Sequence, residues 1–427
     1  MKEHGIATKC VHAGYTAKNG EPIALPIVQS TTYKYDSSDA MGKLFDLEAD
    51  GYFYTRLANP TNDAVAAKIA ALEGGVAGVL TSSGQAANLF AVLNLCAAGD
   101  HVVSSTAIYG GTFNLFNVTL RRMGIAFTFV SPDCSDEELE AAFRENTKAV
   151  FGETLSNPSL NVFDIERFAA AAHRHGVPLI VDNTFPTPVN CRPFEFGADI
   201  VTHSTTKYMD GHATQVGGVI VDSGNFDWTQ NDKFPGLTTP DDSYHGITYT
   251  ERFGKAAFIT KCVAQLMRDL GSIPSPHNAF LLNLGLETLP LRMKKHCENA
   301  MAVARFLEKN PNVSWVSYPG LEGDAEYAKA MKYMPNGTSG VISFGVRGGR
   351  AAATTFMDAL RLCNIVTHVA DCRTCVLHPA STTHRQLSDR QLEEAGVKPD
   401  LIRLSVGLED VEDIIGDLAQ ALEAAAK

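Results

Sequence analysis

The sequence has no excess of positive charge. Its 36 lysine and arginine residues are outnumbered by 48 aspartate and glutamate residues, which gives a formal net charge of −12. Nucleic acids and anionic lipid surfaces attract basic proteins. The charge balance therefore excludes a nucleic-acid-binding protein and a protein held on a membrane by charge, and no long basic run contradicts this.

Long apolar segments are missing as well. No uninterrupted apolar run is long enough to span a bilayer, and residues 1–5 carry charges in place of the apolar core of a secretory signal. We therefore expect a cytoplasmic protein. The hydrophobic content of 45% and the charged content of 20% indicate an ordinary globular chain.

The cysteines do not form a disulfide or zinc pattern. There are nine, an odd number scattered along the chain, which predicts reduced thiols. Cys372 and Cys375 form a CxxC pair, but there is no second such pair and no suitably spaced pair of histidines. We expect no metal site. We interpret the pair as two core or near-site thiols rather than as zinc ligands or a redox couple.

The 427 residues suggest two or three domains by length. Residues 1–58 lack strong periodicity and are predicted to form an extended arm. Residues 59–275 alternate short apolar strands with helices, which is typical of an α/β domain with a mostly parallel sheet. Residues 276–427 are predicted to form a smaller α+β domain that ends in an amphipathic helix.

Lys207 is the residue that best indicates function. It follows the apolar strand 199–201, and Asp182 closes the preceding strand. The carboxyl ends of parallel strands meet at one edge of a sheet, so both side chains are expected in one crevice. A lysine that forms a Schiff base, hydroxyls that hold a phosphate and a carboxylate that keeps a pyridine nitrogen protonated are what pyridoxal phosphate (PLP) requires. The alternative is a structural aspartate and a surface lysine.

Two turns provide candidate phosphate contacts. Ser83 and Gly84 lie between a short strand and a helix, where backbone N–H groups bind phosphate and glycine permits a close approach. Ser204 and Thr206 add hydroxyl groups beside the lysine. The serine–glycine pair is otherwise only a turn or a helix cap.

Three further residues are candidates for the same site. Tyr109 precedes two glycines at a strand end, so its ring could lie over the cofactor or could simply pack in the core. Asn157, before a proline, offers an amide to the ring hydroxyl of the cofactor or forms a plain turn. Arg403 lies in an apolar strand and needs an anionic partner. That partner is a substrate α-carboxylate, or alternatively a residue in a structural ion pair.

Six motifs extend this interpretation to nearly the whole chain. They are YTRLANPT (54–61), TSSGQAA (81–87), VDNTFPTP (181–188), GADIVTHS (197–204), HSTTKY (203–208) and HPASTTH (378–384). Together they resemble the Cys/Met metabolism PLP-dependent enzymes, relatives of cystathionine γ-synthase. The resemblance implies an α/β transferase of PLP fold type I, assembled as a homotetramer of two close dimers.

The resemblance also implies a role for each candidate residue. Lys207 falls on the Schiff-base lysine, Asp182 on the pyridinium partner, Tyr109 on the stacking tyrosine, Asn157 on the residue near the ring hydroxyl and Arg403 on the carboxylate-binding arginine. The residues that match the phosphate site are Gly84, Gln85, Ser204 and Thr206. Tyr54 and Arg56 match a pair that reaches the phosphate of a neighbouring subunit.

The segments GHATQVGG (211–218) and SYHGITYTE (243–251) are similar to the O-acetylhomoserine sulfhydrylase branch. This implies that O-acetyl-L-homoserine reacts with sulfide, or with a small thiol such as methanethiol, in methionine and cysteine biosynthesis. Gly111 stands where methionine γ-lyases tend to carry cysteine. Three alternatives stay open: γ-elimination, a succinyl ester or O-acetylserine as substrate, and a non-catalytic relative. The stretch that carries His368 and Ala370 departs from the family pattern. Relatives have serine or asparagine there, followed by a glycine, near the substrate.

Overall fold

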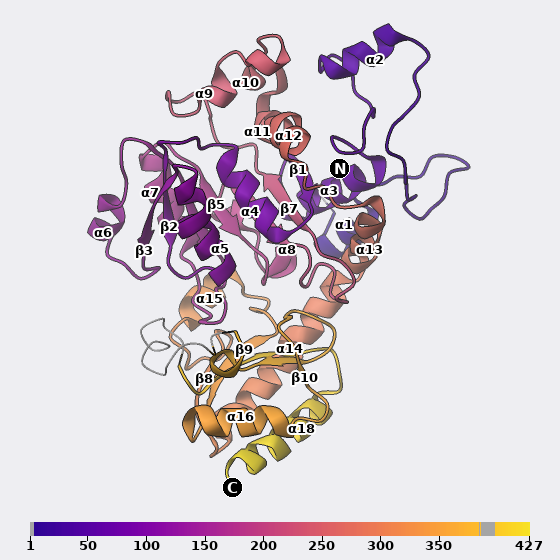
Figure 1. Ribbon diagram of the computed structural model, residues 1–427. Coiled ribbons are helices and arrows are strands. Elements are labelled where there is room, and N and C mark those ends of the chain that lie inside the picture. Colours follow the sequence, from indigo (N-terminus) through magenta and orange to yellow (C-terminus); the bar gives the residue numbers. More distant parts are fainter. Residues whose placement is uncertain (1–3, 384, 386–397) are drawn as a thin grey trace.

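The computed structural model describes residues 4–383, 385 and 398–427 of the protein. Two parts lie one above the other in Figure 1, each built around its own sheet. None of the helices in these residues has the length and apolar composition needed to cross a membrane.

The larger part is built on a seven-stranded sheet with the order β1-β7-β6-β5-β4-β2-β3. Only β7 runs against its neighbours, which confirms the mostly parallel sheet predicted from the sequence. Strands β2, β5 and β7 are buried along their whole length, as expected for strands covered on both faces. The strands are β1 Ala77–Thr81, β2 His101–Ser105, β3 Ala126–Val130, β4 Thr147–Glu153, β5 Leu179–Asp182, β6 Ile200–Ser204 and β7 Gly218–Asp222.

Helices α3 and α4 cover opposite faces of this sheet. Successive side chains of a strand point to opposite faces. On β6, Thr202 donates to Asn88 of α4 (2.6 Å), whereas the next residue, His203, pairs with Glu73 of α3 (2.6 Å). The helices of this part are α3 Pro60–Glu73, α4 Gly84–Leu93, α5 Gly110–Asn114, α6 Asp136–Ala141, α7 Ile165–Arg174, α8 Thr187–Asn190, α9 Pro235–Thr238, α10 Tyr249–Phe253, α11 Ala257–Lys261 and α12 Arg268–Leu270.

The sequence at each end of helix α3 explains where it starts and stops. The Asn59 side chain accepts a hydrogen bond from the Thr61 N–H (3.0 Å), and Pro60 occupies the first helical position. Gly74 closes the helix with φ +84°, a conformation that favours glycine.

Six further helical segments complete the helices of the described chain. Two are π-helical, Leu115–Leu120 and Cys262–Met267, and four are 3₁₀ turns, Pro193–Phe196, Asp242–Tyr244, Gly254–Ala256 and Pro379–Ser381.

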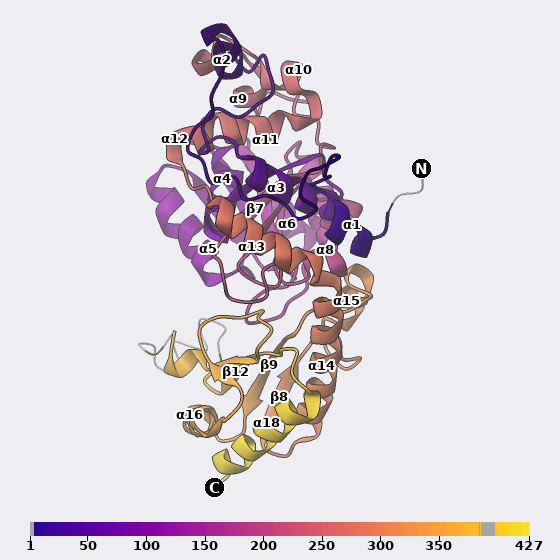
Figure 2. The same cartoon turned by 90° about the vertical axis from the view of Figure 1, so that its right-hand side faces the viewer.

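The first 58 residues, expected to be extended, contain two helices. Helix α1 is Ile6–His12 and α2 is Ser38–Phe45. Figure 1 and Figure 2 show α2 at the top of the molecule. The Arg252 guanidinium of α10 donates to the Leu47 carbonyl (3.1 Å) just after α2, so the arm docks on the irregular segment after β7.

The smaller part has a five-stranded sheet with the order β10-β11-β12-β9-β8. Its core lies between this sheet and the helices α14, α16 and α18. Ile414, Leu418 and Leu422 are buried on the predicted apolar face of α18. The strands are β8 Val313–Ser317, β9 Val341–Val346, β10 Asn364–Ile365, β11 Cys375–Leu377 and β12 Leu401–Ser405. The helices are α13 Pro276–Glu287, α14 Leu289–Lys309, α15 Tyr327–Tyr333, α16 Gly349–Ala359 and α18 Val411–Ala425.

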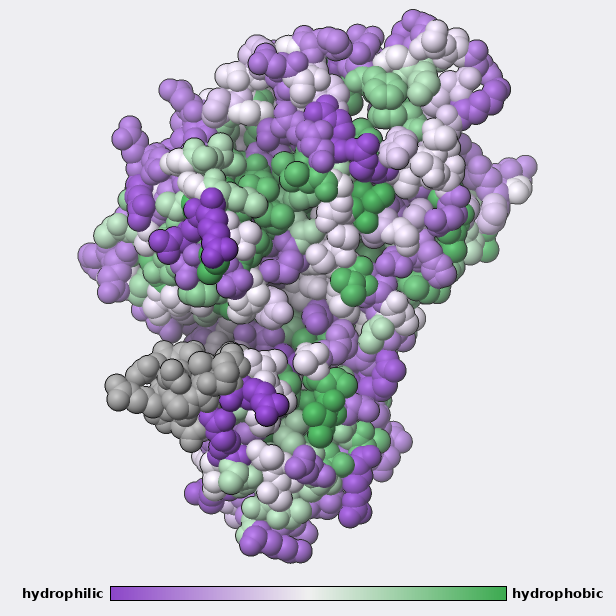
Figure 3. Space-filling view, in the orientation of Figure 1, coloured by the Kyte–Doolittle hydropathy of each residue, from purple (hydrophilic) through white to green (hydrophobic). Residues whose placement is uncertain are grey.

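The two parts share helix α14. Its first turns contribute Leu289 and Met293 to the core of the larger part, and later turns contribute Val303 and Leu307 to the core of the smaller part. The division of the chain at residues 58 and 275 remains a prediction. Figure 3 shows apolar side chains lying among polar ones on this face. Large apolar side chains that are exposed include Phe113 of α5 and Ile365 of β10.

Candidate active site

A cavity of about 240 Å³ lies at the carboxyl ends of β4, β5 and β6. It brings together almost all of the residues selected from the sequence. Those that line it are Ser83, Gly84, Gln85, Tyr109, Asn157, Asp182, Ser204, Thr206, Lys207 and Arg403. These side chains come from both parts of the molecule, because Arg403 belongs to β12 of the smaller sheet.

Lys207 lies in the turn that follows β6. Its N–H donates to the Ser204 carbonyl (3.3 Å), and its carbonyl accepts from the Gly211 N–H (2.8 Å). Burial, and secondly the positive charge of Arg403, lower the pKa of the Lys207 amine to about 8. The lowered pKa increases the neutral, nucleophilic fraction of this amine near neutral pH. The alternative of a surface lysine is wrong.

Asp182 is the last residue of β5 and is 8% exposed. Its carboxylate accepts hydrogen bonds from the Asn88 amide (3.2 Å) and from the Thr184 N–H (3.1 Å) and hydroxyl. The same Thr184 hydroxyl accepts from the Ser204 N–H (2.9 Å). The two strand ends that carry Asp182 and Lys207 are thereby joined through one threonine.

The start of α4 meets the end of β6 very closely. An added Cβ at Gly84 would lie 2.6 Å from the Ser204 Cβ, so only glycine fits here. The Ser83 hydroxyl caps α4 by accepting from the Ala86 N–H (3.1 Å). The Thr206 hydroxyl bonds to the backbone of Gly217. The first N–H groups of α4 are thus presented to the cavity, as a phosphate site requires.

The Tyr109 ring is 50% exposed and lines the cavity, so it is not a core aromatic. Its backbone N–H donates to the Glu153 carboxyl (2.6 Å) at the end of β4. Burial, and secondly the negative charge of Asp182, raise the pKa of Glu153 well above its ordinary value. An added Cβ at Gly111 would lie 2.4 Å from the Tyr109 ring, so a larger residue there would displace the ring.

Arg403 is 7% exposed, and no carboxylate in the described part of the chain pairs with it. Its guanidinium donates to the carbonyls of Thr367 (3.0 Å) and His368 (3.2 Å) and to the Asn157 amide oxygen (3.4 Å). Burial lowers the pKa of Arg403 to about 10. The structural ion pair considered from the sequence is therefore not formed within the described chain, and the cation is held only by neutral acceptors.

Tyr54 and Arg56 do not line the Lys207 cavity. They line two other hollows, of about 400 and 860 Å³, that border the arm. The Arg56 guanidinium donates to the Arg268 carbonyl and lies 5.2 Å from the centre of the Tyr54 ring. The role expected for this pair concerns a neighbouring subunit, and it stays a prediction.

Several side chains of the cavity were not selected from the sequence. They are Asn88, Thr112, Glu153, Thr184, Phe185, Val216, Thr367 and Val369. A signal existed for two of them. Asn88 is a buried amide four residues after Gly84, one helical turn away, and Glu153 ends a buried strand as Asp182 does.

The segment that departs from relatives lies beside the cavity. Ala370 has φ +66°, a conformation that favours glycine. Cys372 and Cys375 are both free thiols, and no cluster of metal-ligating side chains occurs in residues 4–383, 385 and 398–427. Of the motif at 378–384, His384 lies outside the described residues.

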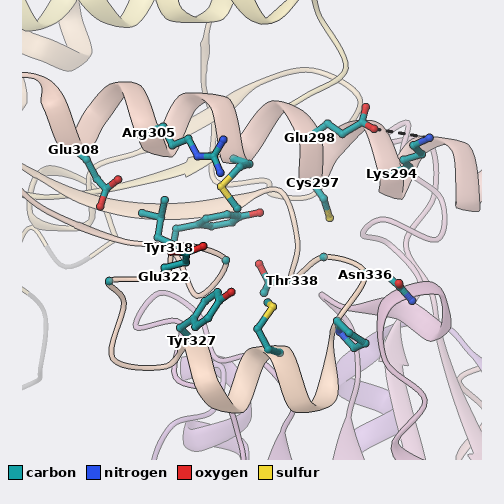
Figure 4. Close-up of a pocket in the computed structure, with 17 residues that line it drawn as sticks. Lys294, Cys297, Glu298, Arg305, Glu308, Tyr318, Glu322, Tyr327, Asn336 and Thr338 are labelled. Carbon is teal, nitrogen blue, oxygen red and sulfur yellow. Dashed lines mark ion pairs between the residues drawn. The ribbon is translucent and has the colours of Figure 1, made fainter.

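A larger hollow of about 840 Å³ lies between α14 and α15 (Figure 4). Its lining includes Cys297, Arg305, Tyr318 and Glu322, and it contains none of the residues selected from the sequence. The charged side chains that line it are exposed, so this hollow lacks the buried cation and carboxylate of the Lys207 cavity.

The family model for Cys/Met metabolism PLP-dependent enzymes matches residues 7–423. The chain belongs to this family. It is 50% identical over 404 residues to a homocysteine synthase of Schizosaccharomyces pombe, with 94% of each chain covered. It is 46% identical over 410 residues to an O-acetyl-L-homoserine sulfhydrylase of Leptospira meyeri, which covers 94% of this chain and 92% of the relative.

Among solved structures, the fold is similar to a putative O-acetylhomoserine (thiol)-lyase of Campylobacter jejuni. The TM-score is 0.94 at 38% identity, and the match covers 98% of this chain and 100% of the other. That crystal structure contains a pyridoxyl-lysine monophosphate. PLP fold type I, expected from the motifs, is thereby confirmed.

The cavity of this family member fits pyridoxal phosphate. Lys207 is a partly buried amine with no hydrogen bond or ion pair to the described residues, and Asp182 is a fixed carboxylate. Gly84 and Gln85, the first residues of α4, line the cavity, where helix N–H groups can bind a phosphate. Lys207 would hold the aldehyde, Asp182 the pyridine nitrogen, and α4 with Ser204 the phosphate.

Proposed function

We propose that this chain catalyses the replacement of the acetyl ester of O-acetyl-L-homoserine by sulfide, which yields L-homocysteine and acetate. The observation that carries the proposal is the convergence of Lys207, Asp182 and Arg403 on one cavity, in a chain whose relatives bear the names of this activity. A small thiol such as methanethiol, which would yield methionine, is the second sulfur donor proposed.

Bound pyridoxal phosphate supplies an aldehyde that holds the amino group of the substrate and a protonated ring that accepts electrons from its Cα. Asp182 maintains the positive charge of that ring through its fixed carboxylate. Arg403 binds the α-carboxylate and orients the Cα–H bond toward Lys207. Because its pKa is about 8, the Lys207 amine can accept the Cα proton and then move a proton at the adjacent Cβ.

Tyr109 is proposed to cover the cofactor ring and to assist proton transfer to the leaving acetate. Its ring is half exposed at the cavity, and the Glu153 carboxyl fixes its backbone. Removal of the acetate leaves an unsaturated carbon chain, to which the sulfur adds at Cγ. The bond to oxygen breaks, and the bond to sulfur forms at the same carbon.

The alternatives are γ-elimination and the use of a succinyl ester or O-acetylserine. Gly111 stands where methionine γ-lyases tend to carry a cysteine, and the lack of that thiol disfavours γ-elimination of the methionine γ-lyase type. A non-catalytic relative is disfavoured because the described site retains all the reacting groups.

A two-substrate assay tests the proposal. Purified holoenzyme is given O-acetyl-L-homoserine with sulfide, and separately L-methionine alone. Homocysteine and acetate in the first reaction, without 2-oxobutyrate in the second, are expected. The reverse pattern would identify an elimination enzyme. Parallel reactions with O-succinylhomoserine and O-acetylserine determine the ester preference.

We further propose that the enzyme is a cytoplasmic homotetramer in which Tyr54 and Arg56 contact the phosphate site of a neighbouring subunit. Their position outside the Lys207 cavity of their own chain supports this arrangement. Molar mass in solution and fractionation of cells test the two parts of this proposal separately.

A further inference from the structure

The residue that receives the substrate carboxylate is held by one loop, residues 367–374. Two of the hydrogen bonds from Arg403 go to carbonyls at the start of this loop, those of Thr367 and His368. Thr367 and Val369 also line the cavity. The position of the Arg403 guanidinium therefore depends on the path of this loop.

The same loop also binds the turn that carries Lys207. The Cys372 N–H donates to the Gly211 carbonyl (2.8 Å), and the Arg373 guanidinium donates to the His212 carbonyl (2.8 Å). Gly211 in turn donates its N–H to the Lys207 carbonyl (2.8 Å). The loop thus connects the two groups that must act on the same substrate molecule.

Asp371 is at the centre of the loop and is 2% exposed. Its carboxylate accepts from the Arg373 N–H (2.8 Å) and, in a forked pair, from the Arg373 guanidinium (2.7 and 3.2 Å). The His368 Nε2 atom lies 3.7 Å from the Asp371 Oδ2 atom. This nitrogen is buried and has no hydrogen-bond partner among the described residues. Asp371 therefore fixes Arg373 near the end of the loop by hydrogen bonds and lies close to His368 near its start.

The backbone beside Asp371 is in a conformation that depends on other contacts. Ala370 adopts φ +66°, which is unfavourable for a residue with a side chain. Its N–H donates to the Ser405 hydroxyl (2.8 Å), two residues beyond Arg403 on β12. Because this conformation is strained, loss of the Asp371 contacts is expected to let the segment relax to an ordinary conformation. The carbonyls that accept hydrogen bonds from Arg403 would then move as well.

We propose that Asp371 is a positioning residue: through the loop 367–374 it sets the place of the Arg403 guanidinium relative to the Lys207 amine, and so makes the enzyme selective for amines that carry an α-carboxylate. This inference rests on the proposed function in one respect, the binding of the carboxylate by Arg403. A displacement of about 1 Å in such a contact is enough to weaken recognition strongly.

The test compares two ligands that differ only in the carboxylate. L-Homoserine and 3-amino-1-propanol are titrated into holoenzyme, and binding is followed by the visible absorption of the cofactor. The wild-type enzyme is expected to prefer homoserine. In Asp371→Asn this preference should fall by about tenfold or more, while the affinity for aminopropanol changes by less than about twofold, as expected for the loss of one charge-assisted contact.

A matched control is available in the same part of the molecule. Asp417 is also a buried aspartate, and its carboxylate accepts the N–H groups of Arg361, Leu362 and Cys363 (2.9 Å each). Asp417→Asn should lower the melting temperature without changing the ratio of the two affinities. If Asp417→Asn changes the ratio as much as Asp371→Asn does, the effect is one of general stability and the proposal is wrong.

Two more variants complete the design. Arg403→Ala should abolish the preference for homoserine; if it does not, Arg403 does not bind the carboxylate and the positioning role of Asp371 is overturned with it. If Arg403→Ala loses the preference but Asp371→Asn keeps it, only the role of Asp371 is overturned. Failure of wild-type enzyme to form homocysteine, with the binding preference intact, would count against the proposed reaction alone.

If Asp371→Asn does not fold, Arg373→Gln provides the same test. The Arg373 side chain is 59% exposed, so its replacement is tolerated more easily, and it removes the forked pair from Asp371. The expected result is again a lower preference for homoserine, and an unchanged preference contradicts the proposal.

Discussion

Glu153 and Asp182 are directly paired across β4 and β5, so two carboxyl side chains meet at the carboxyl ends of neighbouring parallel strands. Burial and the charge of Asp182 raise the pKa of Glu153, which favours its protonated form. Asp182 has three hydrogen-bond donors around it, from Asn88 and Thr184. The negative charge of the pair therefore lies on Asp182, where the cofactor ring needs it.

Glu153→Gln is expected to keep kcat/KM within about threefold of the wild type, because a neutral amide can still accept the Tyr109 N–H. Glu153→Ala removes this acceptor and should weaken both cofactor binding and turnover. Steady-state assays and absorption titrations with pyridoxal phosphate measure these effects. A large loss of kcat in Glu153→Gln would show that Glu153 acts as a charged group.

Asp182→Asn should lower kcat by about 10²–10³-fold, since an amide does not stabilise the protonated pyridine ring. Asp182→Glu retains the charge and is the matched comparison, with a smaller loss. Turnover of O-acetylhomoserine with sulfide is the measurement. Similar activities for the two variants would show that the charge at this position is not required.

The lowered pKa of Lys207 predicts how the stability of the cofactor-free protein depends on pH. Between the folded pKa of about 8 and the ordinary value of 10.5, the unfolded chain binds more protons, so a rise in pH favours folding. This contribution to the free energy of unfolding is roughly 3 kcal/mol. Below pH 8 the charged amine lowers the free energy of unfolding by this amount, and the penalty has disappeared above pH 10.5.

Lys207→Met keeps the shape of the side chain and removes the titrating group. The difference in unfolding free energy between wild type and variant, measured by urea denaturation from pH 7 to 11, should rise in favour of the wild type over that interval. A flat difference would mean that the amine keeps an ordinary pKa in the folded protein. The variant should also fail to show the visible absorption of bound cofactor.

Arg403→Lys should raise the KM for O-acetylhomoserine by about 10–100-fold, because a lysine does not form the bidentate contact with a carboxylate. The KM for sulfide, which has no carboxylate, should change little. Initial rates measured with each substrate varied in turn separate the two constants. Equal effects on both would indicate a collapsed cavity instead of a lost contact.

The position of Arg56 outside its own Lys207 cavity predicts complementation between inactive chains. Lys207→Ala and Arg56→Ala chains, each of low activity, are co-expressed. If each site takes Lys207 from one chain of a two-fold dimer and Arg56 from the other, some mixed dimers contain a site with both residues intact. With random pairing, about a quarter of all sites then have Lys207 and Arg56 together. Lys207→Ala with Asp182→Asn is the control, since both residues line one cavity of one chain, and it should stay inactive.

Much of the site was predictable because its residues lie in turns after buried strands. Asp182, Lys207 and Gly84 could be placed from strand ends and turn residues alone, and Arg403 from a charge in an apolar strand. Asn88, Thr112 and Thr184 were missed because polar residues in helices and turns have many ordinary roles. Their function depends on contacts between segments that are distant in the sequence, such as the Asn88–Asp182 hydrogen bond.

Fold details were missed for similar reasons. Strand β7 was not predicted as an antiparallel member of the sheet, because pairing direction follows from the path of the chain and not from its apolar run. Helix α2 in the arm has only eight residues, and the segment after it is held by a hydrogen bond from Arg252, which no local pattern reveals. The arm was therefore expected to be extended throughout.

Arg403 lies on β12, in the last 25 residues of the chain, whereas every other residue of the site that we selected precedes position 210. During synthesis the lysine, its carboxylate partner and the start of α4 leave the ribosome long before this arginine. Recognition of the amino acid is thus completed only when β12, an inner strand of the smaller sheet, takes its place between β11 and β9.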